Sequence, residues 1–180
     1  MITPVVSIPA PSEDELVRAV RAGSLDALGT LYQRHSPAVF GAAYRILGAR
    51  ADAEDVVQDV FVGLPRALAG YHARGRLQAW LRRVAVRTAL MRLRGSGRRR
   101  EDAFDDLPEL AAPEGEAALD RIALQRRLQG LPEPLRIVLV LKEIEGYSHD
   151  EIAGLLGISA GASAVRLFRA WKHLRSGDPR

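Results

Sequence analysis

Apolar residues recur three or four positions apart along most of the chain, which is the spacing of one face of a helix. No segment alternates apolar and polar residues as a half-buried strand would. Gly48 is expected to end the long helix before it, and Pro37 to kink or divide that helix. Capping boxes, each a serine followed three residues later by a glutamate, start helices at Ser12 with Glu15 and at Ser148 with Glu151. The pattern predicts an all-α fold.

A third helix is predicted from Asp52 to about Leu64, with Pro65 expected to kink or end it. Its apolar stripe consists of Ala53, Val57, Val60, Phe61 and Leu64. The rest of its surface is acidic or polar and carries Glu54, Asp55, Gln58 and Asp59. An acidic face of this kind is often only solvated, and acids in the first turn also suit the helix dipole. Spacing alone therefore leaves open whether this face binds a partner.

The next predicted helix, from about Arg76 to Arg94, carries a stripe of arginines. Trp80 lies on a helical wheel between the apolar stripe and the arginine stripe, which consists of Arg76, Arg83, Arg87 and Arg94. Arginines beside an aromatic ring suit a helix that holds a nucleic-acid backbone while a base stacks on the ring. Trp80 taken alone is more typical of a protein core, and the arginines are alternatively solvated or paired with acids. The absence of nearby acids in the sequence favours nucleic acid for the arginine stripe.

Two short helices joined by a turn at Gly157 are predicted between Ser148 and about Arg175, with Ser159 capping the second. The residues expected to face inward on the second helix are Ser163, Leu167, Ala170, Trp171 and Leu174. Another face carries Ala162, Arg166, Arg169 and His173. No acid occurs from residue 159 to residue 176. The pair fits a DNA-binding helix-turn-helix, although an ordinary helical hairpin with solvated arginines has the same spacing.

Charge is segregated along the chain, with ten arginines and no acid in residues 74–100, then eight acids and no base in residues 101–120. The basic block suits a polyanionic partner and the acidic block a solvated linker. Prolines, a glycine and the lack of a helical period indicate that the acidic block is flexible. We expect two small helical domains, divided as a loose arm at 1–11, a first domain at 12–94, an acidic linker at 95–117 and a second domain at 118–176.

Composition and the spacing of residues exclude several classes of site. The 180-residue chain contains no cysteine, so neither a disulfide framework nor a thiolate zinc site is expected. Its four histidines lack the spacing of metal ligands and it has no Gly-rich phosphate loop, so no metal, cofactor or catalytic site is predicted. No run approaches the roughly 20 apolar residues of a membrane span, and residues 1–11 do not resemble a signal peptide. A cytoplasmic protein is expected, and a DNA-binding regulator that acts alone is one alternative.

Three groups of motifs, in this order, resemble the sigma-70 family of bacterial transcription initiation factors, specifically its short ECF (extracytoplasmic function) group. Residues 52–61 (DAEDVVQDVF) resemble the polymerase-binding helix of that family. Residues 80–85 (WLRRVA) resemble its promoter-melting helix. Five further segments resemble its C-terminal DNA-reading domain: residues 131–136 (LPEPLR), 145–148 (EGYS), 151–153 (EIA), 156–159 (LGIS), and 166–167 (RL) with 169–170 (RA). The resemblance covers almost the whole chain after the first dozen residues.

The resemblance implies a factor that binds core RNA polymerase, directs it to specific promoters and assists DNA melting, without catalytic activity or a cofactor. The polymerase would bind Asp52, Glu54, Asp55, Gln58, Asp59 and Phe61. The downstream promoter element, with its melted non-template strand, would be held by Arg76, Trp80, Arg82, Arg83, Arg87 and Arg94. The upstream element, as duplex DNA, would be read by Ser159, Ala162, Ser163, Arg166, Arg169 and Lys172. Family members are commonly held inactive by an anti-sigma protein, although no residue here identifies one.

Several residues depart from the pattern of the family. Ala162 and Ala164 stand where Thr and Lys are usual, which removes a hydroxyl and a cation that would contact phosphates. The upstream contact is therefore expected to be weaker, or its sequence preference altered. Arg87 and Met91 stand where Asn and Asp are common, and Pro65 replaces a residue that is usually aromatic. Because Arg87 and Met91 lie on the promoter-melting helix, the resemblance does not specify the base preference at the downstream element.

Overall fold

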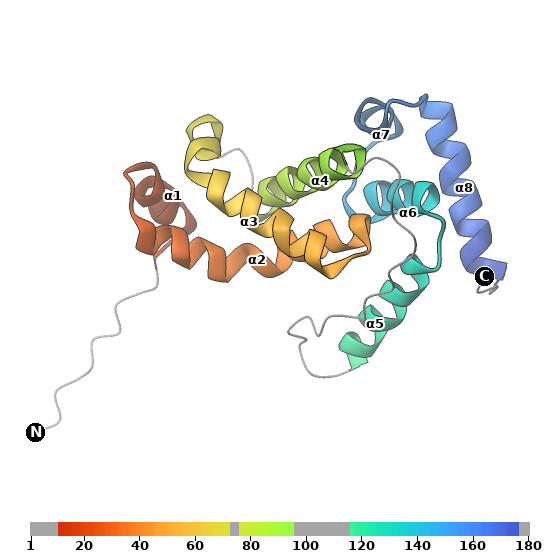
Figure 1. Cartoon of the computed structure of the whole chain (residues 1–180), viewed down its shortest axis with the longest axis horizontal. Coiled ribbons are helices and arrows are strands. Elements are labelled where there is room, and N and C mark those ends of the chain that lie inside the picture. Colours follow the sequence, from red (N-terminus) through yellow and green to blue (C-terminus); the bar gives the residue numbers. More distant parts are fainter. Residues whose placement is uncertain (1–10, 73–75, 96–115, 177–180) are drawn as a thin grey trace, which may run out of the picture.

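The computed structural model describes residues 11–72, 76–95 and 116–176, and these residues form helices without any strand (Figure 1). The N-terminal helices are α1 (Glu13–Arg21), α2 (Leu25–Leu47), α3 (Arg50–Ala67), the short 3₁₀ turn η1 (Leu68–Gly70) and α4 (Leu77–Gly95). The C-terminal helices are α5 (Glu116–Gln129), α6 (Glu133–Leu139), the π turn η2 (Val140–Ile144), α7 (His149–Leu156) and α8 (Ala160–Ser176). The all-α prediction is confirmed. Residues 1–10 of the expected arm and 96–115 of the expected linker lie outside the described residues.

Helix α2 forms the centre of the N-terminal unit, where it packs against α1, α3 and α4 (Figure 1). Its side chains Leu31, Tyr44 and Ile46 are almost completely buried, as is Leu64 of α3. Burying a side chain of this size contributes about 1.5–3 kcal/mol to folding. Because the apolar stripe of α3 faces α2, its acidic residues point away from the core.

Local capping fixes where several helices begin and end. Both capping boxes are present: the Ser12 side chain accepts a hydrogen bond from the Glu15 amide, and the Ser148 side chain accepts one from the Glu151 amide. Gly48 has φ 77° and Gly157 has φ 67°, a left-handed conformation that glycine adopts without steric cost and that ends a helix. These predicted boundaries are confirmed.

Neither proline divides or ends its helix. Pro37 lies inside the continuous helix α2 and does not divide it. Pro65 does not end α3, which extends to Ala67 and passes directly into η1. A proline this close to the end of a helix removes only one backbone donor from the last turn. The buried side chains of Leu64 and Leu68, on either side of Pro65, stabilise that turn.

In the C-terminal unit, α6 packs against α8 and α7 packs across α8. The interior includes Val138, Leu141 and Ile152, all with 0% exposed surface. Helix α6 continues into η2, and this π turn closes with a hydrogen bond of 3.0 Å from the Glu145 amide to the Val140 carbonyl. Residues 137–141 are all buried, and the π turn sets the position of Glu145 directly after η2.

The two units are docked against each other. Helix α6 contacts α2, and α7 contacts α4 (Figure 1). Buried residues from both units form one hydrophobic cluster. The sequence had suggested two modules joined only by a tether, whereas the structure adds a direct interface between them.

His35, on α2, makes the stability of the fold sensitive to pH. Its side chain is buried, with Nε2 3.3 Å from Glu13 Oε1. Burial lowers the pKa of His35 below its ordinary 6.5, and the Glu13 carboxylate opposes this only partly. The unfolded chain therefore binds the proton more readily, so the contribution of His35 is present above about pH 6.5 and is lost as the pH falls through the folded-state pKa.

Replacing His35 with Gln is expected to reduce the loss of stability between about pH 7.5 and pH 5, because Gln does not titrate in this range. Urea denaturation of both chains at the two pH values measures the difference. An equal loss in the wild-type and His35→Gln chains would show that other groups cause the acid sensitivity.

Candidate nucleic-acid and protein-binding surfaces

The acidic face of α3 is exposed along its length. Asp55, Gln58 and Asp59 are exposed, and Val62 one turn later is 82% exposed. Glu54 is also exposed and pairs with Arg50 at 2.7 Å, while Asp52 is half-buried. This arrangement provides a mainly acidic surface with one apolar side chain at its C-terminal end.

Arg92 of α4 bridges two of these acids, a contact that the sequence analysis did not anticipate. Its Nη1 donates to Asp55 Oδ2 at 2.8 Å, and its Nη2 donates to Asp59 Oδ2 at 2.6 Å. The hydrogen bonds that Arg92 donates to the Asp59 carboxylate, and then to the Asp55 carboxylate, raise the pKa of Arg92. Both aspartates keep about half of their side-chain surface exposed, at 54% and 52%. They remain accessible to a basic partner that competes with, or joins, Arg92.

Phe61, predicted to contact the polymerase, does not lie on the surface. It is buried, with 6% of its surface exposed, because it belongs to the apolar stripe that faces α2. The ring of Tyr32 meets it edge to face, with 4.9 Å between centroids. Tyr32 is 46% exposed, so the aromatic side chain at this surface is Tyr32, supported from below by Phe61.

The arginine stripe of α4 lies on the surface. Arg83, Arg87 and Arg94 are exposed, as is Arg76 immediately before the helix. Arg82 lies on another side of α4, where it is half-buried and bonds to Glu145 of the C-terminal unit. Four of the five predicted arginines therefore share one exposed stripe, and Arg82 is already engaged within the protein.

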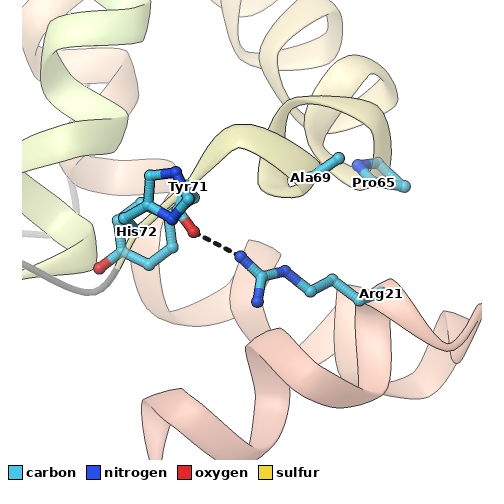
Figure 2. Close-up of a pocket in the computed structure, with 5 residues that line it drawn as sticks. All are labelled: Arg21, Pro65, Ala69, Tyr71 and His72. Atoms are coloured by element: carbon cyan, nitrogen blue, oxygen red, sulfur yellow. Dashed lines mark hydrogen bonds between the residues drawn. The ribbon is translucent and has the colours of Figure 1, made fainter.

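Trp80 is half-buried and packs against the ring of Tyr71, with 5.1 Å between centroids. Arg21 of α1 holds this part of the chain, because its guanidinium donates to the carbonyls of Leu68 and Tyr71. Figure 2 shows the Arg21 guanidinium pointing toward Tyr71 and His72, with Ala69 and Pro65 above the Arg21 side chain in this view. Trp80 is thus partly buried, as expected of a core residue, and partly exposed.

An open pocket of about 560 Å³ lies next to Arg21 and is lined by Arg21, Pro65, Ala69, Tyr71 and His72 (Figure 2). Sequence reasoning did not find it, because its walls come from α1, the end of α3, η1 and the two residues after η1. Pro65, one of the departures from the family pattern, forms part of its wall.

The α7–α8 pair has the geometry of a helix-turn-helix. The two helices are bent by 102° relative to each other, within the range of about 90–120° found in such motifs. The Ser159 hydroxyl accepts a hydrogen bond from the Ala162 amide at 3.1 Å and so caps α8. Arg169 and Lys172 are exposed, and Arg166 and Ala162 are half-buried. The predicted cap and the arginine face are both present.

Two other side chains of α8 differ from the expectation. Ser163, predicted both to face inward and to contact DNA, has 0% exposed surface, and its Oγ lies 2.9 Å from His149 Nδ1. It joins α7 to α8 and is not placed to touch DNA. Trp171, expected to face inward, is 41% exposed because the buried side of the helix is occupied by smaller residues such as Ala170.

Among the described residues, no cluster of three His, Asp or Glu side chains is arranged to hold a metal ion. Within the same part of the chain, no single helix is both long enough and apolar enough to cross a membrane.

Comparison with known proteins connects these surfaces to a family. The family model for Sigma-70 region 2 matches residues 31–99, and that for Sigma-70, region 4 matches residues 121–174. The chain is 30% identical over 172 residues to the RNA polymerase sigma-H factor of Pseudomonas aeruginosa, covering 88% of this chain and 89% of that protein. It is 35% identical over 160 residues to the RNA polymerase sigma factor CarQ of Myxococcus xanthus, covering 86% and 91%.

Solved structures give the same result. CnrH, in complex with the cytosolic domain of CnrY, matches with a TM-score of 0.51 and 30% identity, covering 89% of this chain and 93% of that one. The sigma factor RpoE of Bartonella quintana, in complex with the anti-sigma factor NepR, has the same fold, with a TM-score of 0.58 at 22% identity over 85% of this chain and 96% of that one. The two family models match the two helical units, in the order expected from the sequence. The chain therefore belongs to the sigma-70 family of RNA polymerase sigma factors, in its ECF group.

Proposed function

We propose that this sigma factor binds core RNA polymerase through the acidic face of α3 and brings it to promoters that it contacts with α4 and α8. The observation that supports this proposal is the separation of one exposed acidic helix face from two exposed arginine-bearing faces, in a chain of this family. The polymerase-binding residues are Asp52, Glu54, Asp55, Gln58 and Asp59, with Tyr32 in place of Phe61. The exposed Val62 adds an apolar contact at the end of this face.

Helix α4 is proposed to hold the non-template strand once the downstream element opens, and so to assist melting. Its exposed stripe of Arg76, Arg83, Arg87 and Arg94 suits the phosphates of a single strand. The partly exposed ring of Trp80, packed against Tyr71, suits stacking with an unpaired base. Unpairing costs a few kcal/mol per flipped base, and stacking on an aromatic ring returns about 1–3 kcal/mol per base. Stacking and phosphate contacts together therefore offset much of the cost of opening.

Helix α8 is proposed to read the upstream element as duplex DNA, since a helix-turn-helix places its second helix in the major groove. Arg166 and Arg169 are the candidates for base or phosphate contacts, because arginine pairs with guanine edges and with phosphates. Lys172, one turn further along and exposed, is placed for a phosphate. Ser159 contributes as the cap of the helix.

The protein is proposed to act in the cytoplasm with the polymerase, without catalytic activity of its own. An anti-sigma protein is a proposed partner. Supporting this, the similar sigma factor RpoE was solved with the anti-sigma factor NepR, and the similar CnrH was solved with the cytosolic domain of CnrY.

In vitro transcription tests the proposed function. Core polymerase is incubated with a library of bacterial DNA fragments, with and without this protein, and the 5′ ends of the transcripts are sequenced. New start sites are expected only when the protein is present, each preceded by two short shared elements at a fixed spacing. Tight binding of the isolated protein to a defined duplex, together with no change in the transcripts, would instead indicate a regulator that acts without polymerase.

A further inference from the structure

The end of the continuous helix formed by α3 and η1 is held by a side chain from another helix. The last carbonyls of a helix have no partners within that helix, and a cation near them also suits the helix dipole. Arg21, in the last turn of α1, supplies donors and charge together. Its Nε and Nη2 donate to the Leu68 carbonyl at 3.0 and 2.8 Å, and its Nη2 also donates to the Tyr71 carbonyl. Arg21 therefore fixes the backbone at both ends of residues 68–71.

This contact requires the shape of a guanidinium as well as its charge. A guanidinium is planar and carries five N–H donors in a fixed fork, so one group can serve two carbonyls at once. Hydrogen bonds from an ionised donor are also stronger than those between neutral groups. An ammonium is a compact charge on a flexible stem and does not reproduce the fork. A lysine in place of Arg21 would therefore keep the charge and lose the double contact.

Open space flanks the contact between Arg21 and Tyr71. Both residues line the pocket of about 560 Å³, and both line a second open pocket of about 310 Å³. The other residues that line the second pocket are Asp14, Val17 and Arg18. Because neither pocket is filled by protein atoms, the backbone at Tyr71 has room to shift once the bonds from Arg21 are removed.

The ring of Tyr71 transmits this constraint to Trp80. Tyr71 is buried, with 7% of its surface exposed, and its ring centroid lies 5.1 Å from that of Trp80, with 54° between the ring planes. Trp80 lies near the start of α4 and is only half-buried, so its neighbour Tyr71 restricts the orientation of its ring. A displacement of Tyr71 would give the indole ring more freedom to rotate.

We propose that Arg21 is a positioning residue for the opened promoter strand, which holds Trp80, through Tyr71, in the orientation that stacks an unpaired base. The inference rests on the proposed function, because that function assigns Trp80 to the melted strand. A ring that is already held in its bound orientation loses less conformational freedom when a base stacks on it, so binding costs less. Helix α1, which carries none of the residues assigned to polymerase or DNA, thereby contributes to promoter melting.

The fluorescence of Trp80 tests the first step of the proposal. The chain has two tryptophans, so Trp171→Phe leaves Trp80 as the only one. In this background, Arg21→Ala is expected to lower the fluorescence anisotropy of Trp80, because the indole ring becomes more mobile. Arg18→Ala is the matched control, since it removes an exposed arginine one turn earlier on the same helix. Unchanged anisotropy in a folded Arg21→Ala chain would overturn the proposal.

Arg21→Lys provides a second variant if Arg21→Ala does not fold, which circular dichroism establishes. Because an ammonium lacks the fork of the guanidinium, Arg21→Lys is expected to leave the anisotropy of Trp80 below that of the parent chain. If Arg21→Ala does not fold, an unchanged anisotropy in Arg21→Lys overturns the proposal in its place.

Binding of DNA tests the second step. The same chains are titrated with a labelled single-stranded DNA oligonucleotide of random sequence at low salt. Arg21→Ala is expected to weaken binding by about fivefold or more, the lower end of the effect of losing one stacked base. In a Trp80→Ala background, Arg21→Ala is expected to cause no further loss, because its effect passes through Trp80. An equal loss in both backgrounds would show that Arg21 binds the strand itself or only supports the fold, which overturns the positioning role.

Trp80→Ala alone separates failure of this proposal from failure of the proposed function. If Trp80→Ala does not weaken oligonucleotide binding, Trp80 does not stack a base, and its assignment to the melted strand is wrong. If Trp80→Ala weakens binding and a folded Arg21→Ala chain binds as tightly as its parent, the assignment of Trp80 stands and the positioning role of Arg21 is wrong.

Discussion

Replacing both Asp55 and Asp59 with alanine is expected to weaken binding to core polymerase by about tenfold or more, because charge pairs at the centre of an interface commonly contribute over 1 kcal/mol each. The two carboxylates lie one turn apart on the exposed face of α3 and keep about half of their surface exposed, at 54% and 52%. Competition of the unlabelled variant against a labelled wild-type chain for a fixed amount of core enzyme measures the change.

The fold of the double variant is expected to survive. Exposed ion pairs contribute about 0–1 kcal/mol each, and about 1 kcal/mol shifts the melting temperature of a chain of this size by roughly 2–4 °C. Circular dichroism during heating checks this. Unchanged competition for core polymerase in a folded double variant would remove the acidic face of α3 from the interface.

Arg92→Ala is the informative control, because it breaks the same ion pairs while leaving both acids in place. If Arg92 merely competes with the polymerase for the two aspartates, Arg92→Ala binds core enzyme as tightly as the wild type or more tightly. A loss equal to that of the double variant would mean that the ion pairs organise α3 and α4, and that the acids do not contact the polymerase themselves.

Replacing both Arg166 and Arg169 with alanine is expected to lower transcription at promoters that depend on the upstream element by about tenfold or more, since a specific arginine–base contact is worth about 1–3 kcal/mol. Both residues lie in the middle of α8, a helix that carries no acid. If either contacts a phosphate, the salt dependence of promoter binding should also decrease, with a slope smaller by about one unit for each lost contact. Run-off transcription over a salt series provides both readings.

Arg175→Ala is the matched control on the same helix. Arg175 is exposed near the C-terminal end of α8, and its Nε donates to the Trp171 carbonyl of its own helix. Because it lies away from the face of Arg166 and Arg169, its loss is expected to leave transcription nearly unchanged. Undiminished transcription in the Arg166→Ala, Arg169→Ala chain would show that this helix face does not read the upstream element.

Much of the fold can be predicted from the sequence, because helix boundaries and exposed faces depend on residues that are close together along the chain. A serine side chain reaches an amide only three residues away, so both capping boxes could be recognised from the spacing of two residue types. The exposed arginine stripe of α4 follows from helical periodicity in the same way. Pro65 is an exception to such local rules, because the buried Leu64 and Leu68 on either side of it keep α3 helical as far as Ala67.

A helical wheel gives the direction in which a side chain points but not how deeply it is buried, so it does not decide which single residues reach a surface. Phe61 fits both an apolar stripe and a partner surface by position, and only the packing of α3 on α2 buries it beneath Tyr32. By its position on the helical wheel Ser163 could face inward or toward DNA. Its contact with His149 across the α7–α8 junction shows that it faces inward.

By itself the sequence determined an all-helical chain, the helix-turn-helix at its end, an acidic helix and an arginine-bearing helix, and through these the family. Only the tertiary structure decided which charges meet. Arg92 lies 37 and 33 residues from Asp55 and Asp59, and Glu145 lies 100 and 63 residues from Arg45 and Arg82. Contacts at such separations depend on how helices pack and not on the spacing of residues within one helix, so no periodicity in the sequence records them.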